Sequence, residues 1–331
     1  MQQITNKTLR ILGAGAISIA FGLLAMQPVQ AQPQSWPDKP VKIIVSFAPG
    51  GVTDTVARAL QPKLSEELGQ PVIIENRPGA GGTLAEGLLA RSPSDGYTMM
   101  LTADGVPANP HLNRNLPYDT FKDLMPVSML VRIPLALLVH PSVPANNLGE
   151  FISHVKSQQG KFSYASPGTG TSNHLFMEAF KDMANIDMSH VAYKGGGPAM
   201  GDLMGGHVQA ILISATLAAP QVTSGKVKAV AVTSPKRIEK LPQVATFAES
   251  GYANFQPHTW TGLFLPAGTP KTIVDRLHAA YAKALKAPEV VARMRDLNAE
   301  IVMDSPAEFT KQLRADYDAM GKLIRDRNIG S

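Results

Sequence analysis

The sequence contains no cysteine, little charge and few aromatic residues. Because none of the 331 residues is cysteine, disulfides, zinc–thiolate sites, iron–sulfur clusters and a cysteine nucleophile are excluded. Charged residues make up 17% and aromatic residues 6% of the chain, while 44% is apolar. This composition rules out a disordered chain or a coiled coil and provides for one or two sizeable cores, and the length suggests two domains.

Concentrated positive charge is also missing. The formal net charge is +5, from 31 Lys and Arg against 26 Asp and Glu, but the basic residues occur singly or in pairs. A nucleic-acid surface needs a concentrated basic patch. We therefore expect no nucleic-acid partner.

Long apolar runs are absent except near the N-terminus. Lys7 and Arg10 precede an uncharged, mostly apolar run from Ile11 to Met26, which ends before Val29 and Ala31. This pattern predicts a secretory signal peptide over residues 1–31, cleaved after Ala31. Since the run is shorter than the roughly 20 residues of a membrane-spanning helix, we expect a soluble exported protein.

The mature chain alternates short β-branched segments with helical patterns. The expected strands cover residues 41–47, 72–74, 97–101, 135–139, 162–165, 191–193, 208–213 and 227–232. Two longer helices are expected after residue 270, and Ser305-Pro306-Ala307-Glu308 is a capping box that opens the second. This order predicts parallel βαβ units and an α/β architecture of two lobes with a cleft between them.

The first expected helix has apolar residues four apart, at Val56, Leu60, Leu64 and Leu68. Thr53 or Asp54 is expected to supply its N-cap oxygen. Pro62 lies inside the pattern and is expected to kink the helix.

Enzyme motifs are largely absent. The chain has no Gly-x-Ser-x-Gly elbow, no phosphate-binding loop with Gly-Lys-Ser/Thr and no His-Glu-x-x-His. The eight histidines lie far apart without metal-ligand spacing, so no metal or cofactor is expected: His111, His140, His154, His174, His190, His207, His258 and His278.

Four loops instead combine glycine or hydroxyl residues at a strand end with a following helix. They cover residues 49–54, 78–83, 166–172 and 194–197. Glycine lets backbone N–H groups approach a ligand, and a helix N-terminus carries about half a positive charge. Each loop alone could be an ordinary tight turn, but together they favour an anion-binding cleft. Gly51 is expected to have a positive φ for this purpose.

A series of motifs resembles one known family. The opening Trp36-Pro37-Asp38-Lys39-Pro40, then Glu75-Asn76-Arg77-Pro78-Gly79, Val191-Ala192-Tyr193-Lys194-Gly195 and Ala231-Val232-Thr233-Ser234-Pro235-Lys236-Arg237 are similar to the substrate-binding receptors of tripartite tricarboxylate transporters, the Bug-type receptors. The resemblance covers the whole mature chain.

The resemblance implies a type II periplasmic-binding-protein fold without enzymatic activity. It implies one lobe from residues 32–133 and 252–331 and a second from residues 134–251. The receptor is expected in the periplasm as a monomer that hands a small carboxylate to the membrane subunits of a tripartite tricarboxylate transporter.

The resemblance also implies a set of ligand-binding residues on the two sides of the cleft. The first lobe would contribute Phe47, Gly50, Gly51, Thr53, Asp54, Ala103 and Asp104. The second would contribute Ser166, Gly170, Thr171, Lys194 and Gly195. Asp54 could alternatively cap its helix, Lys194 could be solvated, and Trp260 could belong to the core.

Ligand identity is the least constrained expectation. Many relatives carry an Asp where this chain reads residues 208–215 without an acid. An ammonium group wants a carboxylate partner, so a di- or tricarboxylate or an aromatic carboxylate is favoured over an amino acid. Two alternatives stay open: an exported enzyme acting on a small acid, and a ligand sensor for a membrane kinase.

Overall fold

The computed structural model describes residues 36–158 and 160–330. The chain divides into two units, Met1–Asp38 and Lys39–Ser331, and of the first only residues 36–38 are described. The predicted signal peptide and its cleavage site therefore lie outside the described residues. No helix in the described ranges is long and apolar enough to cross a membrane.

The described strands form one mixed sheet in the order β2-β1-β3-β9-β4-β7-β5-β6, and β8 and β10 also pair with β4. Pairs among β1, β2 and β3 and among β5, β6 and β7 are parallel, while β9 and β4 pair antiparallel with their neighbours. The strands are β1 Val41–Val45, β2 Val72–Asn76, β3 Thr98–Ala103, β4 Leu124–Val139, β5 Ser163–Ser166, β6 Ser189–Ala192, β7 Ala210–Ser214, β8 Lys228–Val232, β9 His258–Pro266 and β10 Glu300–Ile301.

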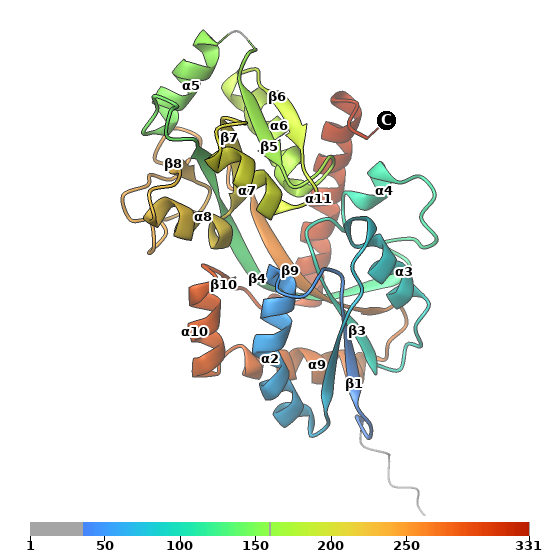
Figure 1. The fold of residues 1–331 in the computed structure, drawn as a ribbon. Coiled ribbons are helices and arrows are strands. Elements are labelled where there is room, and N and C mark those ends of the chain that lie inside the picture. Colours follow the sequence, from blue (N-terminus) through green and yellow to red (C-terminus); the bar gives the residue numbers. More distant parts are fainter. Residues whose placement is uncertain (1–35, 159, 331) are drawn as a thin grey trace, which may run out of the picture. The chain divides into compact units, whose positions relative to one another are not determined.

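Helices follow most strands and cover the sheet (Figure 1). They are α2 Val52–Leu68, α3 Thr83–Ala90, α4 Asn109–Leu112, α5 Leu148–Ser157, α6 Ser172–Ala184, α7 Gly196–Met204, α8 Ala215–Thr223, α9 Lys271–Ala284, α10 Pro288–Asp296 and α11 Pro306–Asp326, with a short 3₁₀ turn η1 Ala80–Gly82.

Helices α2 and α11 test the expected kink at Pro62 and the expected capping box at Ser305. The four apolar residues of the α2 stripe are all buried, and the helix continues past Pro62 to Leu68. Packing of that stripe outweighs the one backbone hydrogen bond that the proline removes. At α11 the Ser305 side chain accepts from the Glu308 N–H and the capping box is complete, as predicted.

Strand β4 is buried on both faces along its second half. Leu135 and Leu137 pack into one apolar cluster with α5 and α6, and Ala136 and Leu138 pack into another with α7 and α8. Leu124 and Met129 in the first half of β4, with two aromatic residues of β9, belong to a third cluster with β1, β3 and the start of α11. These two strands run through the centre of the ribbon (Figure 1).

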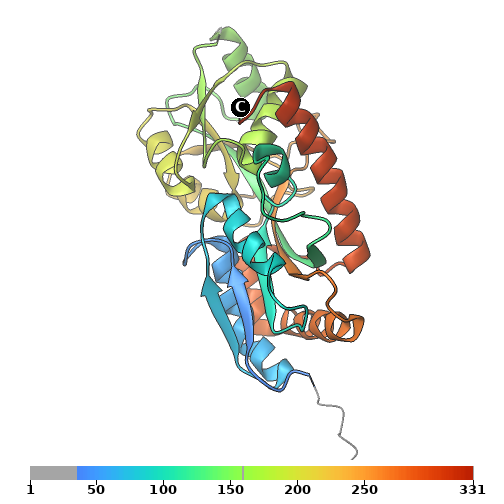
Figure 2. The ribbon, with the colours of Figure 1, turned by 90° about the vertical axis from the view of Figure 1, so that its right-hand side faces the viewer.

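Helix α11 links two of these regions. Phe309 near its start packs on Trp260 of β9, and Met320 near its end packs on Leu175 of α6. Arg327, just after the helix, forms an ion pair with Glu178 of α6 at 3.8 Å. Figure 2 shows the full length of α11 along one side of the ribbon.

Candidate functional site

A cavity of about 450 Å³ lies where the loops after several strands meet. Strand β9 contributes Trp260 and its two flanking threonines, and β4 contributes Ile133. The remaining walls come from strand ends, loops and helices: Phe47, Gly51, Val52, Thr53, Ala80, Gly81, Thr83, Ala103, Asp104, Gly105, Asn109, Leu112, Asn113, Pro167, Thr169, Gly170, Thr171, Ser172, Asn173, Gly196, Ile213, Ser214 and Leu217.

The starts of five helices longer than one turn line this cavity. Val52 begins α2, Thr83 begins α3, Ser172 begins α6, Gly196 begins α7, and Ser214 directly precedes α8. The first N–H groups of a helix have no acceptor within the helix, and the helix dipole makes that end positive. Convergence of these ends makes the cavity suited to a negatively charged group.

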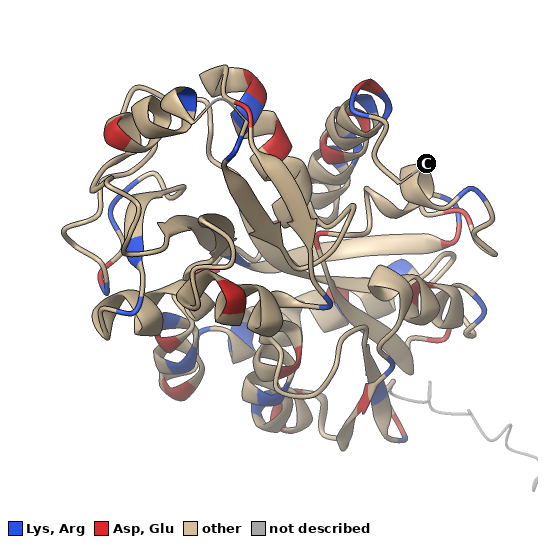
Figure 3. Cartoon of the chain, turned by 45° about the horizontal axis from the view of Figure 1, so that its top comes forward, with Lys and Arg blue, Asp and Glu red and all other residues tan. Residues whose placement is uncertain are grey.

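None of the described residues that line the cavity is Lys or Arg. Among these described residues, Asp104 is the only one with an ionisable side chain. An anion there must be held by backbone N–H groups, hydroxyls and amides instead of by Lys or Arg. Elsewhere, Lys and Arg are interspersed with Asp and Glu on the outer helices (Figure 3), as the sequence indicated.

The start of α2 is shaped by Asp54. Its carboxylate accepts from the Gly50 N–H at 2.9 Å, from Arg58 Nε at 2.9 Å and from Asn76 Nδ2 at 2.9 Å. Burial alone would raise the pKa of Asp54, but these hydrogen bonds outweigh it and hold the pKa below its usual range. Asp54 thus fixes the loop before the helix.

The N-cap of α2 differs from the prediction. It is Gly51, without a side-chain cap, because Asp54 reaches past it to the N–H of Gly50 and the Thr53 position lies inside the helix. The expected positive φ at Gly51 is wrong. Gly51 has a φ of −71°, which any residue can adopt, and the left-handed conformation, with a φ of +82°, is found at Gly50.

The start of α6 is fixed by Thr171 and His174. Thr171 is the N-cap, and its hydroxyl donates to Gly168 O at 2.8 Å and accepts from the His174 N–H at 3.4 Å. His174 Nδ1 accepts from the Gly170 N–H at 3.0 Å, and its ring stacks on His190 at 3.7 Å. Burial lowers the pKa of His174 to about 4, so the ring is neutral and holds the glycine loop.

Asp104 lies in the loop after β3 and is 5% exposed. Ser172 at the start of α6 is hydrogen-bonded to this carboxyl group, while Oδ2 is buried and has no hydrogen-bond partner in the part of the chain that the structure describes. Burial raises the pKa of Asp104 to about 7. The cavity therefore contains one acid that changes charge near neutral pH.

A second buried acid, Glu86 of α3, supports the cavity wall from outside. It accepts from Asn109 Nδ2 at 2.9 Å and from the Tyr118 hydroxyl at 2.5 Å. Burial raises the pKa of Glu86 to about 7 despite these hydrogen bonds. Glu86 thereby holds Asn109, a residue of the cavity lining.

Comparison with known proteins assigns the chain to a family. The profile of the family described as "Tripartite tricarboxylate transporter family receptor" matches residues 56–329. The chain belongs to this family of periplasmic solute-binding receptors. The resemblance found in the sequence is confirmed.

Solved structures agree with that assignment. The receptor is 35% identical to the periplasmic binding protein BugD over 89% of its own chain and 99% of that chain, with a TM-score of 0.76. It is 31% identical to Rpa4515 of Rhodopseudomonas palustris with adipate, with coverages of 89% and 99% and a TM-score of 0.79. MatC from the same organism, with bound malate, is 34% identical over 87% and 100%, with a TM-score of 0.75. The predicted α/β periplasmic-binding-protein fold is confirmed.

The structure brings many of the predicted ligand-binding residues of the receptor together. Those that line the cavity are Phe47, Gly51, Thr53, Ala103, Asp104, Gly170 and Thr171.

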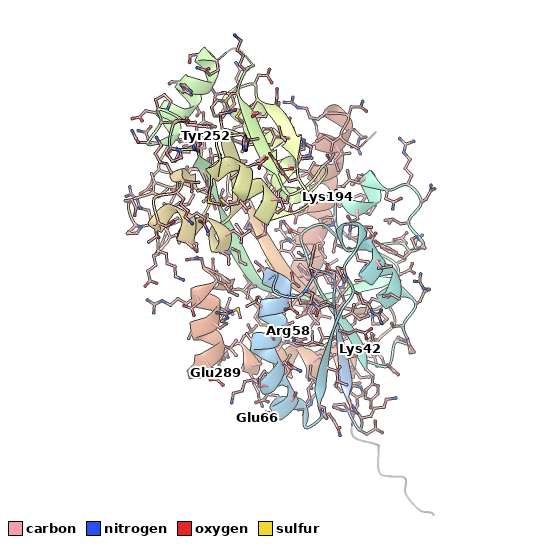
Figure 4. The ribbon with its side chains drawn as sticks, in the orientation of Figure 1. Lys42, Arg58, Glu66, Lys194, Tyr252 and Glu289 are labelled. Atoms are coloured by element: carbon pink, nitrogen blue, oxygen red, sulfur yellow. The ribbon has the colours of Figure 1, made fainter. Side chains whose placement is uncertain are left out.

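The other predicted residues lie outside the lining. Gly50 and Asp54 hold the loop before α2, and Ser166 is buried with its hydroxyl on His190 at 2.7 Å. Lys194 and Gly195 come just before the cavity residue Gly196, and Lys194 is labelled in that loop, with Arg58 on α2, in Figure 4. These residues shape the loops that the predicted contacts come from.

The sequence argument missed several wall residues of the receptor. Ser214 ends β7 and Asn109 begins α4, the helix after β3, and these positions at a strand end and a helix start could have identified them. Thr259 and Thr261 flank Trp260 on β9, a strand that was not expected. Trp260 is 3% exposed and packs on Phe309, so it is a core residue that also forms the cavity wall.

The argument from the missing acid at residues 208–215 was incomplete. No acid comes from β7, but Asp104 from the loop after β3 supplies one to the cavity. The absence of an acid at β7 therefore does not by itself disfavour an amine-bearing ligand.

A second hollow of the receptor, of about 710 Å³, lies beside α10 and residues 233–239. It contains more basic side chains, but Arg132 is paired with Glu300 at 2.8 Å and Arg295 is paired with Glu239. Arg237 is also paired, with Glu249 at 3.0 Å, which leaves Lys236 as the one Lys or Arg of the described lining without an ion pair. Because most of these charges are already neutralised, the hollow is less suited to an anion than the cavity lined by the helix starts.

Proposed function

We propose that this receptor captures a small organic carboxylate in the cavity of helix starts and delivers it to the membrane subunits of a tripartite tricarboxylate transporter. The observation that carries the proposal is that the starts of five helices longer than one turn converge on a cavity whose described lining has no Lys or Arg. Such a site recognises a carboxylate through backbone N–H groups. Adipate and malate in the related structures support this ligand class.

A di- or tricarboxylate or an aromatic carboxylate fits the cavity chemistry. Phe47 and Trp260 offer aromatic surface, while Thr53, Thr83 and Asn173 offer polar groups. Such a lining suits a ligand with an apolar body and charged ends.

We further propose that ligand capture closes two lobes, residues 32–133 with 252–331, and residues 134–251. Helix α9 packs on α2, far away in sequence, and the apolar clusters of residues 135–255 are distinct from that of residues 44–313 around β9. Hinges would lie near residues 131–135 and 251–260. A smaller radius of gyration with ligand in small-angle scattering is expected; an unchanged radius contradicts closure.

The test of ligand class is a thermal-shift screen with citrate, malate, adipate, benzoate and aspartate, and adipamide as the uncharged control. A ligand at 100 times its Kd adds about 2.7 kcal/mol to the free energy of unfolding. At least one carboxylate should raise the melting temperature, and adipamide should not. No shift from any acid contradicts the proposal.

Periplasmic delivery and the monomeric state are parts of the same proposal. Mature protein from the periplasm should begin at Gln32 by mass spectrometry, and retention of Met1 would contradict the signal peptide. Light scattering should give the mass of one chain.

The alternatives lead to different observations. A sensor would bind the same ligand but act on a membrane kinase, so loss of the transporter's membrane subunits would leave its response intact while abolishing receptor-dependent uptake. An enzyme would consume the ligand, which prolonged incubation followed by NMR would detect. We expect the ligand to be recovered unchanged.

A further inference from the structure

Asp104 places a carboxyl group in a cavity that is otherwise suited to a negatively charged ligand. The rest of the lining is neutral or positive in character, yet this carboxyl group shares the cavity with the ligand and is 5% exposed. No Lys, Arg or His among the described lining residues is present to neutralise it. Two ionised carboxylates in one enclosed space, without a counter-ion, repel each other strongly.

One oxygen of Asp104 is buried and has no hydrogen-bond partner among the described residues. This oxygen is Oδ2, and the hydrogen bond between Ser172 and the carboxyl group leaves it unpartnered within the described ranges. A buried polar atom without a partner is costly, so a partner from the ligand is expected. When protonated, Oδ2 can donate to a carboxylate oxygen; when ionised, it cannot.

We infer that Asp104 binds the ligand as the neutral acid, donating its carboxyl proton in a hydrogen bond to a ligand carboxylate oxygen, so that ligand capture takes up a proton from solution. This inference rests on the proposed carboxylate-binding function and extends it to the protonation state of the complex. The proton comes from solvent and stays on Asp104, and no covalent bond changes. Like two acids that share one proton, the pair is stable only in the singly ionised form.

The surroundings of Asp104 favour the neutral acid. Burial raises its pKa to about 7, the hydrogen bond to Ser172 opposes this, and the charge of Asp316 on α11 adds to the rise. Titratable groups on the elements around the loop also include Glu86 on α3, His111 on α4 and His174 on α6. Burial raises the pKa of Glu86 and lowers those of His111 and His174, so all three favour their uncharged forms.

Calorimetry in buffers of different ionisation enthalpy tests the inference. The titrant is whichever acid of the panel gives the largest thermal shift, and its own ionisation is subtracted. With a free pKa of about 7, proton uptake should be about 0.1 per ligand at pH 6 and about 0.9 at pH 8. Above pH 7 the Kd should rise about tenfold per pH unit.

Two variants identify the titrating group. Asp104→Asn should abolish the proton uptake and make the Kd independent of pH between 6 and 8.5. Asp316→Asn removes a neighbouring charge, so it should keep the uptake and move its midpoint to lower pH. If Asp104→Asn does not fold, the pH slope and the uptake of the unmodified protein still decide.

The outcomes separate this inference from the function on which it rests. Binding without proton uptake, or uptake that persists in Asp104→Asn, overturns the inference and leaves carboxylate binding in place. Binding of aspartate alone, without uptake, would make Asp104 an ionised partner of an ammonium group and also overturns it. Failure of every acid in the panel to bind overturns both.

Discussion

A methyl group added at Gly196 should reduce ligand affinity by intruding on the cavity. A Cβ at this position would lie 3.0 Å from Leu217 Cδ1 and 3.1 Å from Ile213 Cδ1, about half an ångström inside ordinary carbon contact. Both neighbours line the cavity, so moving them into it is the easiest way to relieve the overlap. The backbone N–H is kept.

Gly197 provides a matched control. It is the next residue of the same helical turn, and a Cβ there would meet nothing within 4 Å. Overpacking of this kind costs about 1–3 kcal/mol. Because the Gly196→Ala clash is relieved at the expense of ligand space, the loss should appear mainly in binding, as a Kd raised about five- to hundredfold.

The assay is calorimetric titration of both variants with the best acid of the panel, beside thermal unfolding. Gly197→Ala should bind like the unmodified receptor and melt at the same or a slightly higher temperature, because alanine favours helix. Equal Kd values for folded Gly196→Ala and Gly197→Ala would refute the assignment of this cavity as the ligand site.

Three further substitutions test the supports of the cavity. Glu86→Gln should gain stability relative to the parent as pH rises from 5 to 7, by about 1.4 kcal/mol per pH unit, and then level off. Because the pKa of Glu86 is raised in the folded protein, its favourable contribution to the free energy of unfolding is complete below the ordinary pKa of glutamate and is lost as pH rises to about 7. Equal pH profiles of the two proteins in urea unfolding would contradict this. Asp54→Asn should lower the free energy of unfolding by about 1.5–3 kcal/mol, because the hydrogen bonds to Gly50 and Arg58 lose their charge; an unchanged denaturation midpoint would exclude that role. Thr171→Val should cost about 1 kcal/mol of stability through the lost N-cap and less than about tenfold in affinity, because its hydroxyl proton is already engaged within the loop; a larger affinity loss in calorimetry would make it a direct ligand contact.

The sequence predicted the parallel βα units well because their patterns are local. The α2 stripe, the α11 capping box and the glycine loops before α6 and α7 each depend on residues within one or two turns. Strand β9 and the first part of β4 were not predicted. Both strands are largely buried and show no regular alternation of apolar and polar residues. Gly262 in β9 and Pro134 in β4 also weaken a strand pattern.

The candidate site could be located from sequence better than its contacts could be assigned. Loops at strand ends identified the region of the cavity, since the carboxyl ends of parallel strands meet at one edge. Which side chain of a loop faces the ligand depends on tertiary hydrogen bonds. Asp54 is hydrogen-bonded to Arg58 and Asn76, and Ser166 is hydrogen-bonded to His190. No local sequence pattern predicts these partners.

The most direct test of the account is a crystal structure of the receptor with the best acid of the panel. The account predicts carboxylate oxygens within hydrogen-bond distance of the backbone N–H groups that open α2 or α6, with no Lys or Arg in contact. A ligand in the hollow beside α10, or a carboxylate held by Arg132, Lys236 or Arg295, would contradict it.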